Sequence, residues 1–398
     1  MSKNPRLLVA GGSHSDIPLI QAGKALGFFV ITSGNRPEDF GHSYADAYYP
    51  ADYSDPVAIC QLAVELEVDA ICACCNDFSA IACSYTAEQL GLPGHDALKT
   101  TKIIHHKHLW RRFAAENGIP TPTAMGCSSV REAIAALETI ASPWMIKPVD
   151  LTGGKGISKA HMREEALPAI QKALQASKVG HIVVEEFVEG TRHGFTSIIR
   201  EKKVVFHFSD DEHYYLNQYL VSGATSPSSS SPEATADLIR ISEQIISMLN
   251  LTDGIFHVQY IERGGKPCII EICRRAPGDL YVDLVRLSAG VPYAEWIVRA
   301  STGLNLDLVS HSPSNRSITR HCIMGSQKGI YEGLEISPEL ENRIVEQLVW
   351  AKPGDKVDDP STQKFGIVFV EHASVAQRTT DVPRMNQLIE PRIQSDQG

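Results

Sequence analysis

The chain has 398 residues, 43% hydrophobic and 21% charged, and this length predicts two or three packed units rather than one core. Its net charge of −10, without a dense stripe of Lys and Arg interleaved with aromatics, argues against a nucleic-acid partner. No apolar run is long enough to cross a bilayer and the N-terminus lacks a signal-peptide pattern, so we expect a cytoplasmic protein with no membrane partner.

The first hundred or so residues alternate strand and helix signals, which predicts a parallel sheet wrapped by helices. The signals are RLLVAGG, a helix over Asp16 to Leu26, FFVIT, a helix over Val57 to Leu66, and DAICACC. Ligands gather at the carboxyl ends of parallel strands. His14 after the first strand, and Asn76 and Asp77 after the third, are therefore candidate substrate contacts. Helix capping is the compatible alternative for these two loops.

Four cysteines lie close together in AICACCNDFSAIAC, namely Cys72, Cys74, Cys75 and Cys83. Paired CxxC spacings are absent, and cysteine is among the residue types most often buried. We interpret the cluster as core packing, with a metal or redox role as the weaker alternative.

The remaining elements predict two further units and a small terminal module. Pro93 and Gly94 mark a boundary, and a helix over His108 to Asn117 ends at Gly118. The elements expected next are helices over Val130 to Ile140, Arg163 to Ala176 and Ala234 to Leu249, and strands over Trp144 to Val149, His181 to Val188, Phe195 to Arg200 and Lys203 to Ser209. A hairpin, helices to about Thr302, and strands over Ile318 to Met324 and Phe365 to Val370 complete the chain.

A lysine in an apolar strand precedes a glycine-rich stretch in PWMIKPVDLTGGKGIS. Lys147 is that lysine, and Gly153, Gly154, Lys155 and Gly156 follow it. Glycines let backbone amides turn toward a phosphate, and lysines supply the counter-charge. The GxxxxGK[ST] spacing of a P-loop is absent. A phosphate contact and a plain hairpin turn both remain open at this point.

The segment VVEEFVEGTRH places Glu185 and Glu186 at the end of a strand. A strand end that runs into a short linker can present backbone N–H and C=O groups to an adenine edge. The alternative is a solvated acidic edge.

The stretch VQYIERGGKPCIIEICRR predicts a β-hairpin. Gln259 and Glu271 flank the turn and are twelve residues apart, so antiparallel pairing can set both on one face toward a pocket. Mg²⁺ prefers such oxygen ligands. Arg274 and Arg275 follow at once, and neighbours in a strand face opposite sides, so we expect one of the two guanidiniums to face the site.

In this order the motifs resemble those of the ATP-grasp superfamily over roughly residues 1 to 305. Lys107 in HHKHLWRRFAAENGIPTP resembles the first nucleotide lysine and Lys147 the second. The implied fold is α/β and α+β. It comprises a Rossmann-like parallel-sheet domain (1–98), a linker helix and lid subdomain (99–190), a large subdomain with the metal hairpin (191–305) and a C-terminal α+β module (306–398).

The resemblance implies roles for the segment after the lid strand. Glu185 would hold adenine through its side chain and Val188 through its backbone, with Glu186 and Phe187 beside them. His193 would approach the ribose, because the register is similar to that of biotin carboxylase.

For the hairpin, the resemblance implies Gln259 and Glu271 as metal ligands, and carbamoyl phosphate synthetases look similar in using glutamine there. Arg275 would be the catalytic arginine, with Lys147 beside the transferring phosphate. Cys273 stands where asparagine is usual, and a neutral thiol is a poor partner for a hard cation.

The implied function is a ligase that uses ATP and Mg²⁺, or Mn²⁺, to turn a carboxylate into an acyl phosphate for attack by an amine or thiol. Alternatives are bicarbonate-dependent carboxylation and a regulatory ATP-binding protein without catalysis. The expected partners are small carboxylates and amines, and a homodimer is the assembly considered. The glycine loop and the loop Ser222 to Ser231 are expected lids, and the candidate substrate contacts are Ser222, Thr225, Ser226 and Arg274.

Overall fold

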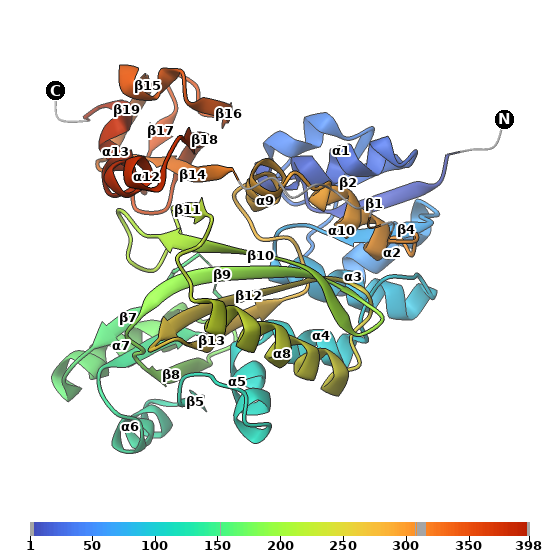
Figure 1. Ribbon diagram of the computed structural model, residues 1–398. Helices are drawn as coiled ribbons and strands as arrows, with labels where there is room; N and C mark the ends of the chain where they lie inside the picture. Colours follow the sequence, from blue (N-terminus) through green and yellow to red (C-terminus); the bar gives the residue numbers. More distant parts are fainter. Residues whose placement is uncertain (1–3, 152, 307, 309–315, 396–398) are drawn as a thin grey trace.

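The computed structural model describes residues 4–151, 153–306, 308 and 316–395 (Figure 1). Within these residues the strands form one parallel sheet and three antiparallel sheets. Every helix in the described ranges is too short or too polar to cross a bilayer.

The N-terminal unit is a parallel sheet in the order β3-β2-β1-β4. Its elements are β1 (Arg6–Ala10), β2 (Phe29–Gly34), β3 (Ala47–Pro50), β4 (Ala70–Ala73), α1 (Ile17–Ala25), α2 (Pro56–Glu65) and α3 (Asp77–Leu90). Leu7 and Val9 pack into one apolar cluster while Leu8 and Ala10 pack into another, as expected for a sheet covered on both faces. The predicted alternation of strands and helices is confirmed. The sequence prediction missed β3, which is short and has partly exposed side chains.

Three of the clustered cysteines lie in this core. Cys72, Cys74 and Cys83 are buried, and burial raises the pKa of the Cys72 thiol to about 11. These thiols are therefore neutral at physiological pH and fill space as small apolar groups, which agrees with the packing interpretation.

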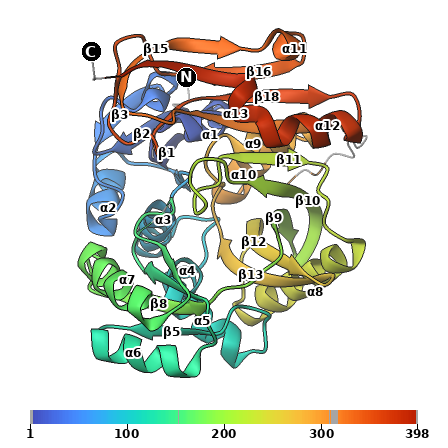
Figure 2. The same ribbon diagram turned by 90° about the vertical axis from the view of Figure 1, so that its left-hand side faces the viewer.

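Two linker helices, α4 (Leu98–His105) and α5 (Lys107–Glu116), lead to an antiparallel lid sheet in the order β5-β8-β6-β7. The lid elements are β5 (Ala124–Cys127), α6 (Val130–Thr139), β6 (Trp144–Pro148), β7 (Ser158–Ala160), α7 (Arg163–Ala176) and β8 (Ile182–Glu186). Figure 2 shows α6 and α7 at the opposite end of the molecule from the C-terminal strands. The predicted helices of this subdomain and its strands β6 and β8 are confirmed, whereas β7 was not predicted.

The large sheet is antiparallel, in the order β13-β12-β9-β10-β11-β14-β18-β16. Its strands are β9 (Thr191–Arg200), β10 (Lys203–His213), β11 (Gly223–Ser226), β12 (Gly254–Arg263), β13 (Lys266–Cys273), β14 (Ser317–Met324), β16 (Ile344–Val349) and β18 (Lys364–His372). The predicted boundary near residue 305 precedes β14, which pairs with β11 and so continues the large sheet. The C-terminal module therefore shares a sheet with the unit before it.

The helices of this half are α8 (Pro232–Met248), α9 (Tyr281–Ala289), α10 (Tyr293–Ser301), α11 (Pro338–Glu341), α12 (Val375–Asp381) and α13 (Met385–Leu388). A small sheet, β17-β15-β19, is formed by β15 (Gly329–Ile336), β17 (Lys356–Val357) and β19 (Ile389–Gln394). Tyr293 and Trp296 of α10 share an apolar core with Leu7 and Val30. This core fixes the N-terminal unit beside the end of β13.

The prediction of a lid over Ser222 to Ser231 is wrong for its first half. Residues 223–226 form β11, which pairs with β10 on one side and β14 on the other, and Ser222, Thr225 and Ser226 are buried. The Thr225 hydroxyl contacts His213 and Thr319, the Ser222 hydroxyl accepts from Tyr215 N, and none of the three residues borders the cavities described below. They are structural residues rather than substrate contacts.

Candidate active site

Three adjoining cavities run from the lid to the N-terminal unit and the C-terminal strands. The lid cavity, of about 690 Å³, lies between the lid and the β12–β13 hairpin. It shares Glu212 and Gln259 with a central cavity of about 630 Å³. The central cavity shares Asp279 with an outer cleft of about 1550 Å³ between the N-terminal unit, the glycine loop and the C-terminal strands. The lid cavity and the central cavity thus adjoin at Glu212 and Gln259.

The segment from Glu186 to Val188 borders the lid cavity. The N–H groups of Glu186 and Phe187 donate to Thr123 O (2.9 Å) and Pro143 O (2.8 Å). Among the described residues none accepts the N–H of Val188. Apolar side chains from lid and hairpin form the walls, namely Met145, Ile157, Val188, Ile261 and Ile270.

Lys147 and Glu185 form a buried ion pair beside this cavity. The Lys147 ammonium lies 2.6 Å from Glu185 Oε2, and Arg111 Nε lies 2.9 Å from Oε1. Burial opposes ionisation of Glu185, but the two cations outweigh it and lower its pKa to about 2. The prediction that Glu185 holds adenine with its side chain does not fit, because both carboxylate oxygens are occupied by these cations.

His193 does not reach the lid cavity. Its ring is 1% exposed, contacts Asp211 (2.9 Å) and Thr191 (2.7 Å), and stacks on Tyr260. Neighbours in a strand face opposite sides, so the preceding Arg192 lines the cavity instead. The predicted ribose contact by His193 is therefore not supported, and sequence reasoning missed Arg192.

Lys107 and the glycine loop meet near the hairpin. Lys107 Nζ lies 3.6 Å from Glu271 Oε1 and donates to Leu151 O at 3.4 Å. Gly153, Gly154 and Gly156 have φ of +66°, +74° and +71°, which favours glycine. A Cβ on Gly154 would lie 2.6 Å from Tyr219 O, so the loop packs closely on that segment.

Gly153 and Lys155 line the outer cleft, while Tyr219 lines the lid cavity. The loop therefore lies along the edge between these two cavities. Its role as a cover for phosphates remains a prediction.

The hairpin pairs as its sequence predicts. Gln259 lies directly opposite Glu271 across β12 and β13, and both line the central cavity. Cys273 is buried beside them, and burial raises the pKa of its thiol to about 12, so it supplies no negative charge at physiological pH.

Sequence reasoning missed Glu212 at the end of β10, whose carboxylate accepts from Gln259 Nε2 at 2.8 and 2.9 Å. The alternation Asp210, Glu212 in that strand could have indicated two cavity-facing acids.

Arg275 lines the central cavity and is held by the N-terminal unit. Its Nε and Nη2 lie 3.0 and 2.9 Å from Asp77 Oδ1, and His105 Nδ1 lies 2.9 Å from the same oxygen. Burial opposes both charges, but their mutual attraction outweighs it, so the pKa of Asp77 is lowered and that of Arg275 raised. Asp77, predicted as a substrate contact, instead fixes the predicted catalytic arginine.

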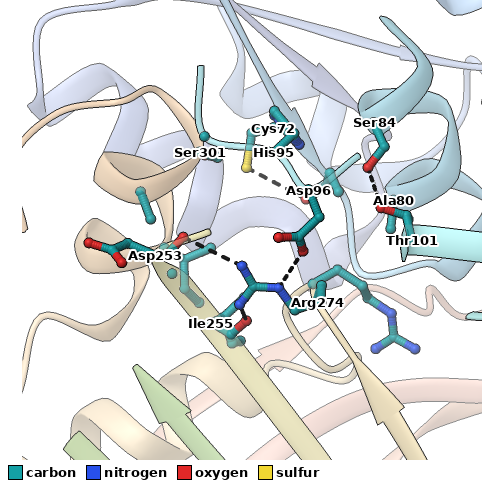
Figure 3. Close-up of a pocket in the computed structure, with 16 residues that line it drawn as sticks. Cys72, Ala80, Ser84, His95, Asp96, Thr101, Asp253, Ile255, Arg274 and Ser301 are labelled. Carbon is teal, nitrogen blue, oxygen red and sulfur yellow. Dashed lines mark hydrogen bonds and ion pairs between the residues drawn. The ribbon is translucent and has the colours of Figure 1, made fainter. Parts of the chain in front are cut away.

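Arg274 does not line the central cavity but lines another cavity of about 490 Å³, which Arg275 also borders (Figure 3). Its Nε lies 2.7 Å from Asp96 Oδ2, and its remaining nitrogens donate to the carbonyls of Thr252 and Ile255. The prediction that Arg274 binds a substrate carboxylate is wrong, since these partners already satisfy its guanidinium. It ties β13 to the segment that ends the N-terminal unit.

Two aspartates and an arginine that the sequence did not indicate also line the central cavity, namely Asp210, Asp279 and Arg320. Asp210 is 1% exposed and accepts from the Tyr281 hydroxyl at 2.5 Å, and burial raises its pKa to about 7. Arg320 of β14 lines the same cavity and donates to Asp279 O at 2.8 Å.

Asp279 and Leu280 have φ of 58° and 54°, a conformation that non-glycine residues rarely adopt and that clusters at functional sites. Asp279 lines both the central cavity and the outer cleft, and its carboxylate lies 2.5 Å from Lys364 Nζ.

His14 lines the outer cleft, whereas Asn76 does not. The His14 ring stacks on Trp350 with centroids 3.9 Å apart, which joins the N-terminal unit to the C-terminal module. Asn76 caps α3 by accepting from Phe78 N at 2.9 Å. Both loops cap a helix, through Ser13 with Asp16 and through Asn76, and both also border a cavity, through His14 and through Asp77.

Comparison with known proteins places part of the chain in a known family of domains. Residues 105–246 match the family model described as phosphoribosylglycinamide synthetase, ATP-grasp (A) domain. Residues 105–246 are therefore identified as an ATP-grasp domain. A curated relative, the formate-dependent phosphoribosylglycinamide formyltransferase of Burkholderia cenocepacia, is 29% identical over 193 residues. That match covers 46% of this chain and 46% of the relative, so it spans about half of the relative's length.

Two solved structures share the ATP-grasp fold over nearly the whole chain. The L-amino acid ligase from Bacillus licheniformis is 18% identical with a TM-score of 0.81, covering 99% of this chain and 100% of that one. The biotin carboxylase domain of the Hydrogenobacter thermophilus 2-oxoglutarate carboxylase, a dimer in complex with MgADP and bicarbonate, is 18% identical with a TM-score of 0.77. It covers 99% of this chain and 92% of that one.

ATP-grasp enzymes bind ATP with Mg²⁺, and the oxygen-bearing side chains of the hairpin fit that ion. Gln259, Glu271 and Glu212 come from three strands of one sheet, and Gln259 touches Glu212 directly. Oxygen donors of this kind are what Mg²⁺ selects, usually with one or two carboxylates.

Proposed function

We propose that this chain is an ADP-forming ligase that activates a carboxylate as an acyl phosphate and joins it to an amine, or to a thiol. The observation that carries the proposal is the contact between the lid cavity and the central cavity at Gln259 and Glu212, with Arg275 in the second cavity. A nucleotide in the lid cavity would direct its terminal phosphate at an acid in the central cavity. Positioning and charge neutralisation supply most of the catalysis in phosphoryl transfer.

Each part of the site has a role in this reaction. Val188 N–H would meet the adenine edge, while Lys107 and Lys147 would neutralise the phosphates. A carboxylate oxygen of the acid attacks the γ-phosphorus, the bond to the ADP oxygen breaks, and ADP leaves. Arg275 would stabilise the charge on the transferring group. The nucleophile then attacks the acyl carbon and phosphate departs. A bound Mg²⁺ would screen the phosphate charge during transfer.

The outer cleft would admit the nucleophile. It reaches the central cavity at Asp279 and is lined by His14, Lys155 and Trp350 from three parts of the chain. The L-amino acid ligase supports an amino acid as one substrate, and the relative named for formate supports a small acid. Both substrates are small molecules in this proposal, and a homodimer has a precedent in the 2-oxoglutarate carboxylase domain.

Bicarbonate-dependent carboxylation through carboxyphosphate is the second candidate. It is favoured by the neighbour whose structure holds MgADP and bicarbonate, and by the two guanidiniums, Arg275 and Arg320, around the central cavity.

Release of ADP from MgATP should be measured while amino acids and small carboxylates are supplied singly and in pairs. The proposal predicts release that needs an acid and a nucleophile together, with one ADP per bond formed. The variant Arg275→Gln should bind ATP and release no ADP. Turnover with bicarbonate and no other acid would establish the carboxylase instead. ATP binding without ADP release for any pair would indicate a regulatory protein.

A further inference from the structure

Glu212 occupies the one place where the lid cavity and the central cavity meet beside the hairpin. It lines both cavities together with Gln259. Within the described part of the chain its hydrogen-bond partners are the Gln259 amide and the Tyr214 hydroxyl (2.5 Å), which are both neutral. Burial raises the pKa of Glu212, and the charges of Arg320 and Arg192 oppose this rise without a direct bond to it. A half-buried carboxylate therefore stands on the path of the phosphates without a cation in contact with it.

A carboxylate at this position disfavours nucleotide binding unless a cation binds between the carboxylate and the phosphates. A carboxylate repels a triphosphate at short range, and partial burial strengthens the repulsion because water screens less. A divalent cation between them would reverse the sign of the interaction.

The contact with Glu212 also decides which way the Gln259 side chain points. An amide oxygen turned toward the carboxylate would be repelled, whereas the amide nitrogen donates to both of its oxygens at 2.9 and 2.8 Å. The amide oxygen must then face away from Glu212. Gln259 lies directly opposite Glu271 across the hairpin, and both residues line the central cavity.

We propose that Glu212 is a positioning residue of the metal site: it turns the amide oxygen of Gln259 toward the metal and supplies the negative charge that glutamine lacks at that position. The inference rests on the proposed function, since it assumes that a metal–nucleotide complex binds between the lid and the hairpin. It explains how a hairpin with a glutamine and one carboxylate retains a divalent cation.

The test measures metal binding directly, with Mn²⁺ in place of Mg²⁺. Free Mn²⁺ is followed by its electron paramagnetic resonance signal while the full chain is titrated with saturating ADP present. Glu212→Gln should weaken Mn²⁺ binding about 10- to 100-fold, as loss of such supporting groups does elsewhere. ADP binding with EDTA present should be no weaker in this variant, because a charge that repels phosphate has gone. This second measurement separates loss of the metal from misfolding.

Two further variants sharpen the result. Glu212→Gln combined with Gln259→Glu moves the carboxylate from β10 to β12, on the other side of β9, and should restore Mn²⁺ binding. Asp211→Asn removes the adjacent carboxylate, which bonds to His193 (2.9 Å) and Ser228 (2.7 Å) instead, and should leave Mn²⁺ binding unchanged.

Mn²⁺ binding by Glu212→Gln within twofold of the wild type would overturn the inference and leave the proposed function intact. The inference would also be overturned if the double variant did not recover Mn²⁺ binding although it still bound ADP in the presence of EDTA. Absence of any ADP binding by the wild type would overturn both.

Discussion

Replacement of Glu185 by Gln is expected to destabilise the protein by about 3 kcal/mol at neutral pH. The carboxylate is 1% exposed and lies between Arg111 (2.9 Å) and Lys147 (2.6 Å). Burial opposes its ionisation, but the two cations lower its pKa from 4.5 to about 2. A shift of about 2.5 units corresponds to about 3.4 kcal/mol at ~1.36 kcal/mol per unit. Glutamine keeps the shape and removes the charge.

The pH dependence gives the sharper check. Because the folded pKa lies below the unfolded one, the stabilisation is complete above the unfolded value of 4.5 and is lost as the pH falls toward 2. The difference in free energy of unfolding between wild type and variant, measured in urea, should therefore shrink as the pH falls below about 5. Glu186→Gln, which alters a neighbouring carboxylate that accepts from Thr123 N at 3.1 Å, is the matched control. A difference below about 1 kcal/mol at neutral pH, or one independent of pH, would refute this reasoning.

Three other substitutions test the remaining assignments. Lys147→Ala should weaken ATP binding at least tenfold by calorimetry, because it removes a phosphate counter-charge, and undiminished binding would refute its role. Arg274→Met should lower the free energy of unfolding by about 3 kcal/mol or more, since it leaves the buried Asp96 without its cationic partner. A loss of affinity for the carboxylate substrate without a loss of stability would instead support a substrate role for Arg274. Asp77→Asn should lower kcat by up to about 100-fold through misplacement of Arg275 while the ATP dissociation constant changes little, with partial rescue by Asp77→Glu. Equal losses in kcat and ATP affinity would contradict that positioning role.

The sequence predicted the features that depend on local pattern. The alternating N-terminal sheet, the lid strands and the pairing of Gln259 with Glu271 all follow from periodicities and from a short turn that fixes register. The adjacent arginines also differ as the strand alternation predicts, since Arg275 lines the central cavity and Arg274 does not. Which of them faces the cavity depends on Asp77 and Asp96, and these carboxylates are far away in the chain.

Other features depended on contacts that no local pattern contains. His193 and Arg192 are neighbours in one strand, and only the sheet's orientation decides that Arg192 lines the lid cavity. Thr225 lies in a Ser-rich stretch typical of a loop, but pairing with β14 from the C-terminal module makes its segment a buried strand. Glu212 becomes significant only because β10 ends beside the hairpin.

The central claim is that a carboxylate oxygen is transferred to phosphate, and isotope labelling tests it most directly. Once an acid that supports ADP release is found, it is supplied with ¹⁸O in its carboxylate, and the phosphate formed is examined by mass spectrometry. Activation as an acyl phosphate predicts one ¹⁸O atom in each phosphate released, in step with formation of the new bond. Unlabelled phosphate would mean that water attacks ATP without activation of the acid, and would contradict the ligase mechanism.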